Sequence, residues 1–280
     1  MYEYSADFYR YLASFAARSA RAVVPRLTAF LPVRSVVDFG CGQGAWLSVW
    51  RSTGASVVGV DGPYVDPNRL LIDAAAFHAA DLAQPIDLGR RFDLVQSLEV
   101  AEHLPAARAE QFIATLTAHG PCVLFSAAIP GQGGENHINE QPPGYWRAIF
   151  RKRGYVAIDC LRPQLVNDPA VERSYRYNMM LYVTEPHLAS LPEAVRACRV
   201  RDGEALVDYR PFSYRLQNAV VRRLPLEAVN RLARLKASLA ATGAHRAAPS
   251  GVGGQADQQD PERDKGDPDP ARRRDRLAED

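Results

Sequence analysis

The sequence predicts an α/β fold in which helices cover both faces of a doubly wound, seven-stranded sheet. Short apolar runs rich in valine and leucine recur along residues 35–184. Segments with the apolar spacing of a helix separate most of these runs. Strands that alternate with helices form parallel sheets that are buried on both faces, which is why they read as continuous apolar runs.

The expected elements follow one another in a simple order. We expect strands at residues 35–39, 56–61, 77–81, 92–98, 122–126, 155–160 and 178–183. We expect helices at residues 5–31, 45–51, 105–118 and 145–153. The last two strands lack a clear helix between them, so one of them is expected to run antiparallel.

The chain divides into four parts. Residues 1–32 form a helical N-terminal lid, residues 33–184 the α/β domain, and residues 185–242 a helical C-terminal extension. We expect this extension to pack on the domain or on a second copy of the chain, which would form a homodimer. Residues 243–280 have Val252 and Leu277 as their only large aliphatic residues, which predicts a disordered tail.

Composition excludes several functional classes. No stretch approaches the ~18 uncharged apolar residues of a membrane span, and the N-terminus lacks the pattern of a signal peptide. A cytoplasmic protein is therefore expected. The net charge of +2 gives no argument for a nucleic-acid partner. The four cysteines are scattered and contain no C-x-x-C pair, so we interpret them as buried thiols.

The most specific motif joins the first strand to the following helix. Asp38 precedes glycines at every second position, Gly40, Gly42 and Gly44. Glycine permits a positive φ and lets a ligand lie against bare backbone, and a helix N-terminus offers free N–H groups. A dinucleotide site has the spacing G-x-G-x-x-G. The G-x-G-x-G spacing found here leaves little room for a pyrophosphate.

This pattern resembles motif I of the class I S-adenosylmethionine (SAM)-dependent methyltransferases, and the resemblance extends over residues 33–184. It implies a Rossmann-like fold with SAM as the cofactor, bound in a methyltransferase domain. In that family the glycine loop passes beneath the methionine part of SAM. The resemblance implies that Asp38, Gly40, Cys41 and Gly42 line this part of the site.

Further cofactor contacts are expected at the ends of the next strands. Asp61 ends the second strand about 20 residues past the glycine loop, where Rossmann-like folds place a carboxylate on the ribose hydroxyls. The family resemblance implies that Asp81 and Leu82 read the adenine. Residues 92–97 resemble motif IV, which places Ser97 beside the reactive end of SAM.

Acids and histidines gather after the fourth and fifth strands. Glu99, Glu102 and His103 have the spacing i, i+3, i+4, so a helical turn would present them on one side. His137 lies in a second polar cluster at residues 133–140. Two carboxylates and two neutral imidazoles suit a divalent ion such as Mg²⁺ or Mn²⁺. The cluster resembles those of ubiquinone-biosynthesis O-methyltransferases and of small-RNA 3′-end methyltransferases, which implies metal ligation by all four residues.

Two alternatives to a metal stay open. His103 could act as a general base that Glu102 or Glu99 orients, or the histidines could have purely structural roles. The favoured function is O-methylation of a small molecule or of a sugar or glycan, with or without metal assistance. The alternatives are an RNA ribose 2′-O-methyltransferase and a SAM-binding protein without catalysis. No RNA-binding motif is visible, which disfavours the first of these.

Overall fold

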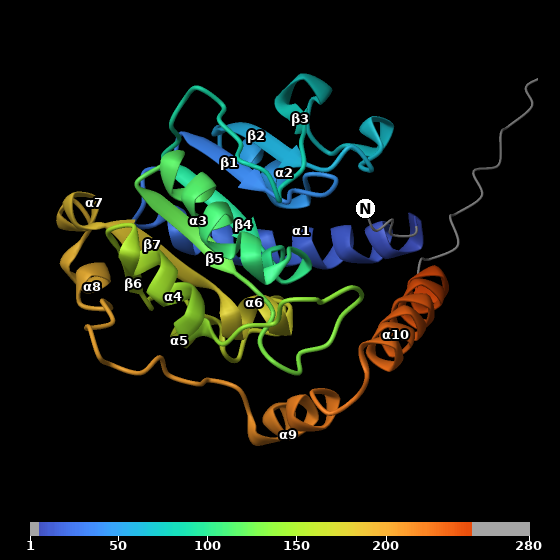
Figure 1. Ribbon diagram of the computed structural model, residues 1–280. Helices are drawn as coiled ribbons and strands as arrows, with labels where there is room; N and C mark the ends of the chain where they lie inside the picture. Colours follow the sequence, from blue (N-terminus) through green and yellow to red (C-terminus); the bar gives the residue numbers. More distant parts are fainter. Residues whose placement is uncertain (1–5, 248–280) are drawn as a thin grey trace, which may run out of the picture.

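The structure is a computed structural model that describes residues 6–247, and within them it contains one seven-stranded sheet (Figure 1). The spatial order of the strands is β3-β2-β1-β4-β5-β7-β6. The first five strands in this order are parallel, and β7 runs antiparallel to both β5 and β6. The bounds are β1 Ser35–Phe39, β2 Ser56–Asp61, β3 Phe77–Ala79, β4 Leu94–Leu98, β5 Cys122–Ser126, β6 Tyr155–Ile158 and β7 Met180–Thr184.

Ten α-helices and four short 3-10 turns accompany the sheet within residues 6–247. The helices are α1 Ala6–Thr28, α2 Ala45–Ser52, α3 Ala109–Ala118, α4 Pro143–Lys152, α5 Arg162–Leu165, α6 Arg173–Asn178, α7 Glu185–Ala189, α8 Glu193–Arg196, α9 Phe212–Val221 and α10 Leu226–Ala247. The 3-10 turns are η1 Pro67–Arg69, η2 Ala74–Ala76, η3 Ala101–His103 and η4 Ala106–Arg108.

Two hydrophobic layers lie on opposite faces of the sheet. Neighbouring residues of a strand point to opposite faces, so Val36 packs with Leu27 of α1 and Trp50 of α2 on one face. Val37 belongs to the other face, together with Phe112 of α3 and Phe150 of α4. The doubly wound α/β fold that the apolar runs predict is therefore confirmed, including one antiparallel strand, β7, which lies between β5 and the edge strand β6.

The structure differs from the sequence prediction at three connections. The short helices α5 and α6 lie between β6 and β7, where no helix was expected. The helix expected over 105–118 begins as the 3-10 turn η4 and becomes α-helical only at Ala109. Residues 243–247, which were expected to belong to a disordered tail, form the end of α10. The rest of that tail, residues 248–280, and residues 1–5 lie outside the described residues.

The C-terminal helices lie against the long loop that connects β5 to α4. Asn230 of α10 accepts a hydrogen bond from the backbone N–H of Asn136 at 2.9 Å. Arg234 of α10 forms an ion pair with Glu135 at 2.9 Å. The same helix also lies beside α1 (Figure 1). None of the described helices is long and apolar enough to cross a membrane.

Candidate functional site

The glycine loop begins where β1 ends, and its glycines have different roles. Gly40 and Gly42 both have positive φ, 90° and 53°. A Cβ on Gly40 would lie 2.3 Å from a methyl group of Val100, so this glycine is required by protein packing. A Cβ on Gly42 would meet nothing within 4 Å. Gly42 therefore borders open space against which a ligand can lie, as the sequence motif predicts for the loop.

Asp38 lies buried behind this loop in a short chain of hydrogen bonds. Its Oδ2 accepts from Nε2 of Gln96 at 2.9 Å, and Oε1 of Gln96 accepts from the Trp50 indole at 3.1 Å. Its Oδ1 is buried with no hydrogen-bond partner among the described residues. Burial raises the pKa of Asp38 to about 8, Gln96 opposes the shift, and the charge of Asp61 adds to it. An unpartnered buried oxygen of this kind suits the cationic amino group of SAM.

Asp61 ties the end of β2 to the glycine loop. Its Oδ2 accepts from the backbone N–H of Gly42 at 2.6 Å. Its Oδ1 accepts from Gly62 N–H at 2.7 Å and from the Tyr64 hydroxyl at 2.6 Å. Burial raises the pKa of this carboxyl, and the three donors oppose the shift. The carboxylate therefore lies beside the loop, as expected for a ribose ligand, and Tyr64 occupies part of its accepting capacity.

The other expected cofactor residues lie in varied surroundings. Asp81 is exposed, and its carboxylate accepts from the backbone N–H of Ala83 at 2.9 Å. Leu82 is buried in the hydrophobic layer that also holds Val37. Ser97 is fully buried near the end of β4, and its hydroxyl has no partner within the described part of the chain. The thiol of Cys41 is buried close to Gly59, and it donates to the carbonyl oxygen of Gly42 at 3.4 Å.

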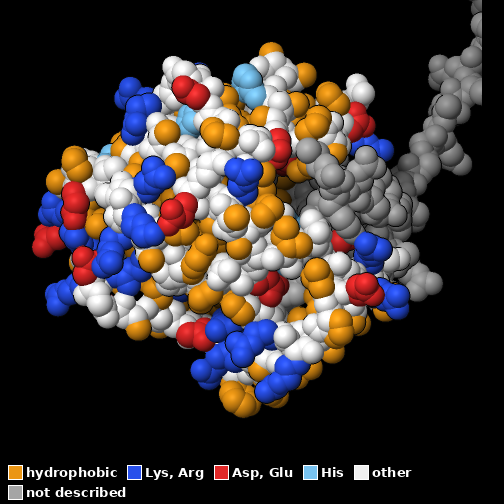
Figure 2. All heavy atoms as spheres, viewed as in Figure 1, with side chains coloured by type: hydrophobic (Ala, Val, Ile, Leu, Met, Phe, Trp, Pro, Cys, Tyr) orange, Lys and Arg blue, Asp and Glu red, His pale blue; other side chains and the backbone are white. Residues whose placement is uncertain are grey.

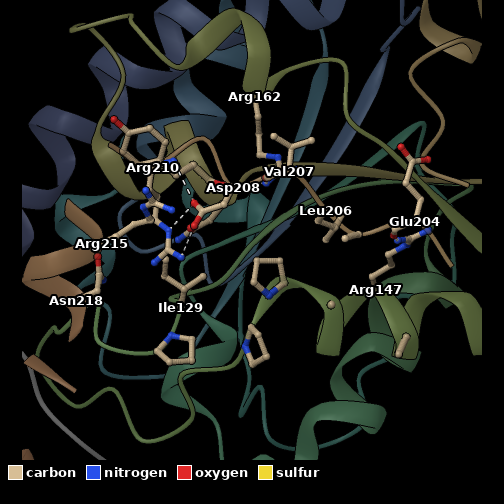
Figure 3. Close-up of a pocket in the computed structure, with 18 of the residues that line it drawn as sticks. Ile129, Arg147, Arg162, Glu204, Leu206, Val207, Asp208, Arg210, Arg215 and Asn218 are labelled. Atoms are coloured by element: carbon tan, nitrogen blue, oxygen red, sulfur yellow. Dashed lines mark hydrogen bonds and ion pairs between the residues drawn. The ribbon is translucent and has the colours of Figure 1, made fainter. Parts of the chain in front are cut away.

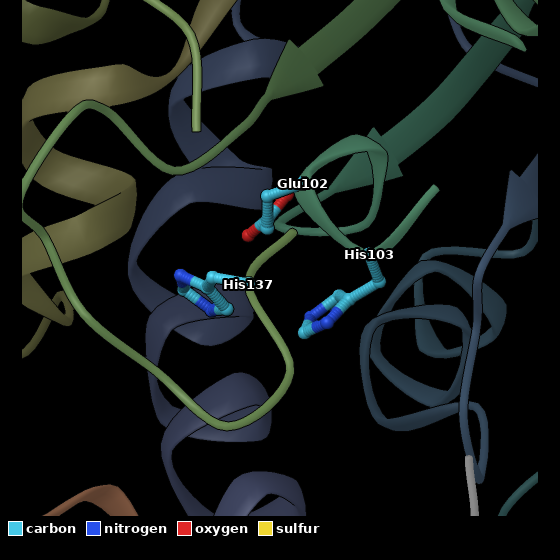
Figure 4. Close-up of side chains that lie close together, drawn as sticks. All are labelled: Glu102, His103 and His137. Carbon is cyan, nitrogen blue, oxygen red and sulfur yellow. The ribbon is translucent and has the colours of Figure 1, made fainter. Parts of the chain in front are cut away.

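Three of the four expected metal ligands converge. Glu102 and His103 belong to η3 after β4, and His137 lies in the loop after β5 (Figure 4). One potential ligand atom from each of the three residues lies within 4.8 Å of the others. The two imidazole rings have centroids 5.0 Å apart and stand nearly perpendicular, at 81°. Loops after β4 and β5 thus bring together groups that are 34 residues apart along the chain, from His103 to His137.

Hydrogen bonds orient both imidazoles in the same way. Nδ1 of His103 lies 3.2 Å from the carbonyl oxygen of Asn136, and Nδ1 of His137 lies 2.9 Å from Oε1 of Glu140. Both partners are acceptors, so each Nδ1 carries the ring hydrogen and each Nε2 is the unprotonated nitrogen, which is the form that ligates a metal. Burial, followed by the proximity of His137, lowers the pKa of His103 to about 3. His103 is therefore neutral, which is the form that binds a metal.

Glu102 is the carboxyl group of the cluster. Its side chain is fully buried, and neither carboxylate oxygen has a hydrogen-bond partner among the described residues. Burial raises the pKa of this carboxyl well above its ordinary value, and the charges of Glu99 and Glu140 raise it further. A buried carboxylate without partners is costly unless a proton or a cation neutralises it. Together with two neutral imidazoles, this residue fits a divalent cation.

Glu99 lies outside this group of three. Its oxygens accept from Nε2 of Gln132 at 2.6 Å and from Nδ2 of Asn178 at 3.3 Å. The expected arrangement required one helical turn from Glu99 to His103. The residue instead has a left-handed φ of 58°, and the helical turn begins only at Ala101. The spacing i, i+3 therefore does not place Glu99 and Glu102 on one face, and the structure leaves the expected metal set without its fourth member.

Several residues that shape the site were not singled out from the sequence. Glu140 orients His137 and also accepts from the backbone N–H groups of Gly131 and Gly133, at 2.7 and 2.8 Å. Gln96 binds Asp38 from the middle of an apolar strand. Its signal was visible, because a polar side chain inside a buried strand requires a partner. Glu140 had no comparable signal, since its contacts depend on how the loop closes.

The fold and the site together define a class of protein. A family model described as a methyltransferase domain matches residues 12–128 of the chain. These residues contain the glycine loop, Asp61 and the Glu102–His103 pair. The matched domain, the sequence motifs and the strand order identify this part of the chain as a class I SAM-dependent methyltransferase domain.

Similar proteins include a ubiquinone biosynthesis O-methyltransferase of Methylobacterium nodulans, which is 34% identical over 91 residues. The match covers 29% of this chain and 34% of the relative, so it spans about a third of the relative's length. Among solved structures, DesVI of Streptomyces venezuelae matches with a TM-score of 0.49 and 15% identity, over 65% of this chain and 100% of that one. Magnesium protoporphyrin IX methyltransferase of Synechocystis, with bound SAH, matches with a TM-score of 0.44 and 20% identity, over 63% and 86%.

Proposed function

We propose that the protein is a SAM-dependent O-methyltransferase whose acceptor is a hydroxyl group of a small molecule or sugar, assisted by a divalent metal. The observation that carries the proposal is the convergence of Glu102, His103 and His137 beyond the ends of β4 and β5. These strand ends lie at the same edge of the sheet as the glycine loop, which follows β1. Ligands of open α/β sheets bind at this edge.

The cofactor side of the site would use residues of β1, β2 and the glycine loop. Asp38 offers an unpartnered buried oxygen, and Gly42 borders open space. Asp61 would exchange the hydroxyl of Tyr64 for a ribose hydroxyl, because both are O–H donors to the same oxygen. SAM, when bound, supplies a methyl group on a positively charged sulfur, so the transfer needs no further activation of the methyl donor.

The acceptor side requires alignment of a hydroxyl and removal of its proton. Glu102, His103 and His137 would hold the metal through one carboxylate and two Nε2 atoms. A divalent ion, when bound, lowers the pKa of a hydroxyl and fixes its direction. Three protein ligands leave further coordination positions for other oxygens.

A metal-free general base remains the second candidate, and the environment of His103 disfavours it. A base works best when its pKa lies near the operating pH. Burial lowers the pKa of His103 to about 3, so it attracts a proton only weakly. A cation would also neutralise the buried carboxylate of Glu102, which otherwise has to keep a proton. Both observations support the metal over the base.

Titration of the full chain with Mn²⁺ tests the proposal, and calorimetry and electron paramagnetic resonance measure the bound ion. We expect one bound ion in the wild type and a loss of binding in Glu102→Gln, His103→Ala and His137→Ala. Glu99→Gln is the matched control, because Glu99 lies beside the cluster but outside it. We expect it to retain most of the affinity. Methyl transfer should stop with EDTA and recover with Mg²⁺ or Mn²⁺.

The metal-free alternative predicts a different set of results. EDTA would leave methyl transfer unchanged, and His137→Ala would be far less damaging than His103→Ala. Absence of SAM binding by calorimetry would reject the methyltransferase proposal itself, whatever the result with metals.

A further inference from the structure

A large cavity lies between the loop that follows β5 and the C-terminal extension. Its volume is about 820 Å³, and it is walled by α4, by residues 202–208 and by α9 (Figure 3). This volume falls within the range of small-molecule sites. Arg147 of α4 builds one wall, because its guanidinium donates to the backbone carbonyls of Val200, Arg201 and Glu204. The extension is thereby fixed to the methyltransferase domain.

The cavity is rich in positive charge. Six arginines line it, against three acids, Asp202, Glu204 and Asp208. The arginines are Arg147, Arg151, Arg162, Arg210, Arg215 and Arg222. The lower edge of the molecule, where α9 lies, also shows gathered Lys and Arg side chains (Figures 1 and 2). A concave site lined by one sign of charge concentrates ligands of the opposite sign.

Only some of these arginines are neutralised by acids. Arg162 is buried and binds Asp159 at 2.7 Å, and Arg210 binds Asp208 at 2.8 Å. Arg147 is held by carbonyl groups and not by a carboxylate. Arg222 is exposed at the end of α9, and no acidic side chain in the described part of the chain forms an ion pair with it. This arginine is available to an external anion.

Asn218 adds an unused polar group to the same wall. Only 3% of this residue is exposed, and it lines the cavity from α9. Neither its amide nitrogen nor its amide oxygen has a hydrogen-bond partner among the described residues. Buried amides normally find partners. The backbone N–H of Arg222 donates to the carbonyl oxygen of Asn218, so the two residues are neighbours at the end of α9. An unpartnered amide next to this exposed arginine therefore indicates a ligand that the protein alone does not supply.

A short hydrogen-bond chain leads from the cavity wall to Glu99, which lies outside the metal cluster but close to it in the sequence. Asn178 lines the cavity, and its amide nitrogen donates to Gln132 at 2.8 Å and to Glu99 at 3.3 Å. Glu99 follows β4 directly and precedes Glu102 of η3 by three residues. A molecule seated in the cavity would therefore have one end close to the residues that border the metal cluster.

From these observations we infer that the cavity binds a carboxylate or phosphate group of the methyl acceptor, with Arg222 at its mouth and Asn218 in its wall. The acceptor is thus an anionic hydroxylated molecule. This inference rests on the proposed methyl-transfer function. Arg215 in α9 and Arg222 at its end would contact the anion, and guanidinium groups match the planar oxygen pairs of both carboxylate and phosphate.

Calorimetric titration tests the inference. The full chain, free of divalent metal, is titrated separately with inorganic phosphate, with citrate and with uncharged glucose. We expect phosphate or citrate to bind and glucose not to bind. Arg222→Gln should weaken anion binding by about tenfold or more, because it removes a charge-assisted hydrogen bond. Arg223→Gln is the matched control, since this neighbouring arginine does not line the cavity. Its affinity should stay within about twofold of wild type.

A second variant tests whether a loss of anion binding results from misfolding. Asn218→Asp places a negative charge in the cavity wall with almost no change in size, so it should weaken anion binding while the thermal melt stays cooperative. Stronger binding of phosphate than of citrate would assign a phosphate-bearing acceptor, and the reverse a carboxylate. No binding of either anion, or equal losses in Arg222→Gln and Arg223→Gln, would overturn the inference.

Titration with SAH on the same preparation separates the two proposals. SAH binding without anion binding rejects the anionic acceptor and leaves the methyltransferase proposal standing. Anion binding without SAH binding rejects the methyltransferase proposal, and with it the assignment of the cavity to an acceptor. Methyl transfer to galacturonate or glucose 6-phosphate but not to galactose or glucose, lost in Arg222→Gln alone, would support both proposals together.

Discussion

Nδ1 of His137 lies 2.9 Å from Oε1 of Glu140, three residues further along the same loop. The same carboxylate also holds the backbone N–H groups of Gly131 and Gly133. One side chain thus closes the loop after β5 and sets the tautomer of a residue in the proposed metal cluster. Carboxylates that bind the second nitrogen of a ligating histidine commonly have this role.

Replacing Glu140 by alanine should weaken metal binding without removing a ligand. The free His137 ring would rotate and populate both tautomers, so we expect the affinity for Mn²⁺ to fall by about 10–100-fold. Calorimetry measures this loss. Nitrogen-15 NMR of the histidine rings provides a second readout, since Nδ1 of His137 should carry the hydrogen in the wild type and only part of the time in Glu140→Ala.

His119 is an internal reference for the same spectrum. Its Nδ1 lies 2.7 Å from the carbonyl of Thr115, and its Nε2 accepts from the backbone N–H of Leu88 at 3.1 Å. Its tautomer is therefore fixed by contacts that do not involve Glu140. An altered His119 signal would show that the variant perturbs the whole fold, and an unaltered His137 signal would show that Glu140 does not orient the ring.

Asn230 of α10 should contribute to the site from outside the α/β domain. It accepts from the backbone N–H of Asn136, a residue with a left-handed φ of 60°, whose carbonyl faces His103. Asn230→Ala leaves this N–H without its partner and should lower the free energy of unfolding by about 1 kcal/mol. We also expect weaker Mn²⁺ binding in calorimetry, because the loop loses an anchor. Arg231→Ala, an exposed neighbour on the same helix, should change neither quantity.

Sequence patterns predicted the sheet well because each strand has its own signal. The alternation of Val36 and Val37 toward two faces follows from strand geometry alone, and the glycine loop follows from its spacing. The short helices α5 and α6 were missed because they consist of four and six residues, too few for a helical period to be visible.

The candidate site was harder to predict than the sheet. Glu102, His103 and His137 were expected together and lie together. Glu99 was expected with them on the assumption of a continuous helical turn. Its left-handed backbone breaks that turn, and residues with a positive φ other than glycine have no reliable sequence signal. The cavity could not be predicted at all, because residues 178, 207 and 222 meet only through tertiary packing.

Asp61→Ala should weaken the binding of SAH, measured by calorimetry, by at least about tenfold. The substitution removes the proposed charge-assisted hydrogen bonds to the ribose and also releases the N–H of Gly42. Tyr64→Phe should not weaken SAH binding, because it frees Oδ1 of Asp61 from a competing hydroxyl. Its SAH affinity should be unchanged or higher. The control is Asp73→Ala, which changes an exposed aspartate. An equal loss of SAH affinity in this variant would contradict a specific role for Asp61.

The last prediction concerns the stability of the ligand-free protein as a function of pH. Burial raises the pKa of Asp38 from 3.8 to about 8. Between these values the folded protein keeps a proton that the unfolded chain has released, so stability falls as pH rises from about 4 to about 8. The slope from this one group is at most about 1.4 kcal/mol per pH unit. Asp38→Asn keeps the shape and the hydrogen bond to Gln96 but cannot ionise.

The free energy of unfolding in urea, measured at intervals from pH 5 to pH 8, checks this prediction. Because only the wild type loses stability through ionisation of Asp38, its advantage over Asp38→Asn should shrink steadily as pH rises and level off above about pH 8. Other titrating groups are common to both proteins and cancel in the difference. Asp81→Asn, at an exposed position, should follow the wild-type profile. A difference between wild type and Asp38→Asn that stays constant across the range would mean that Asp38 is already ionised in the folded protein.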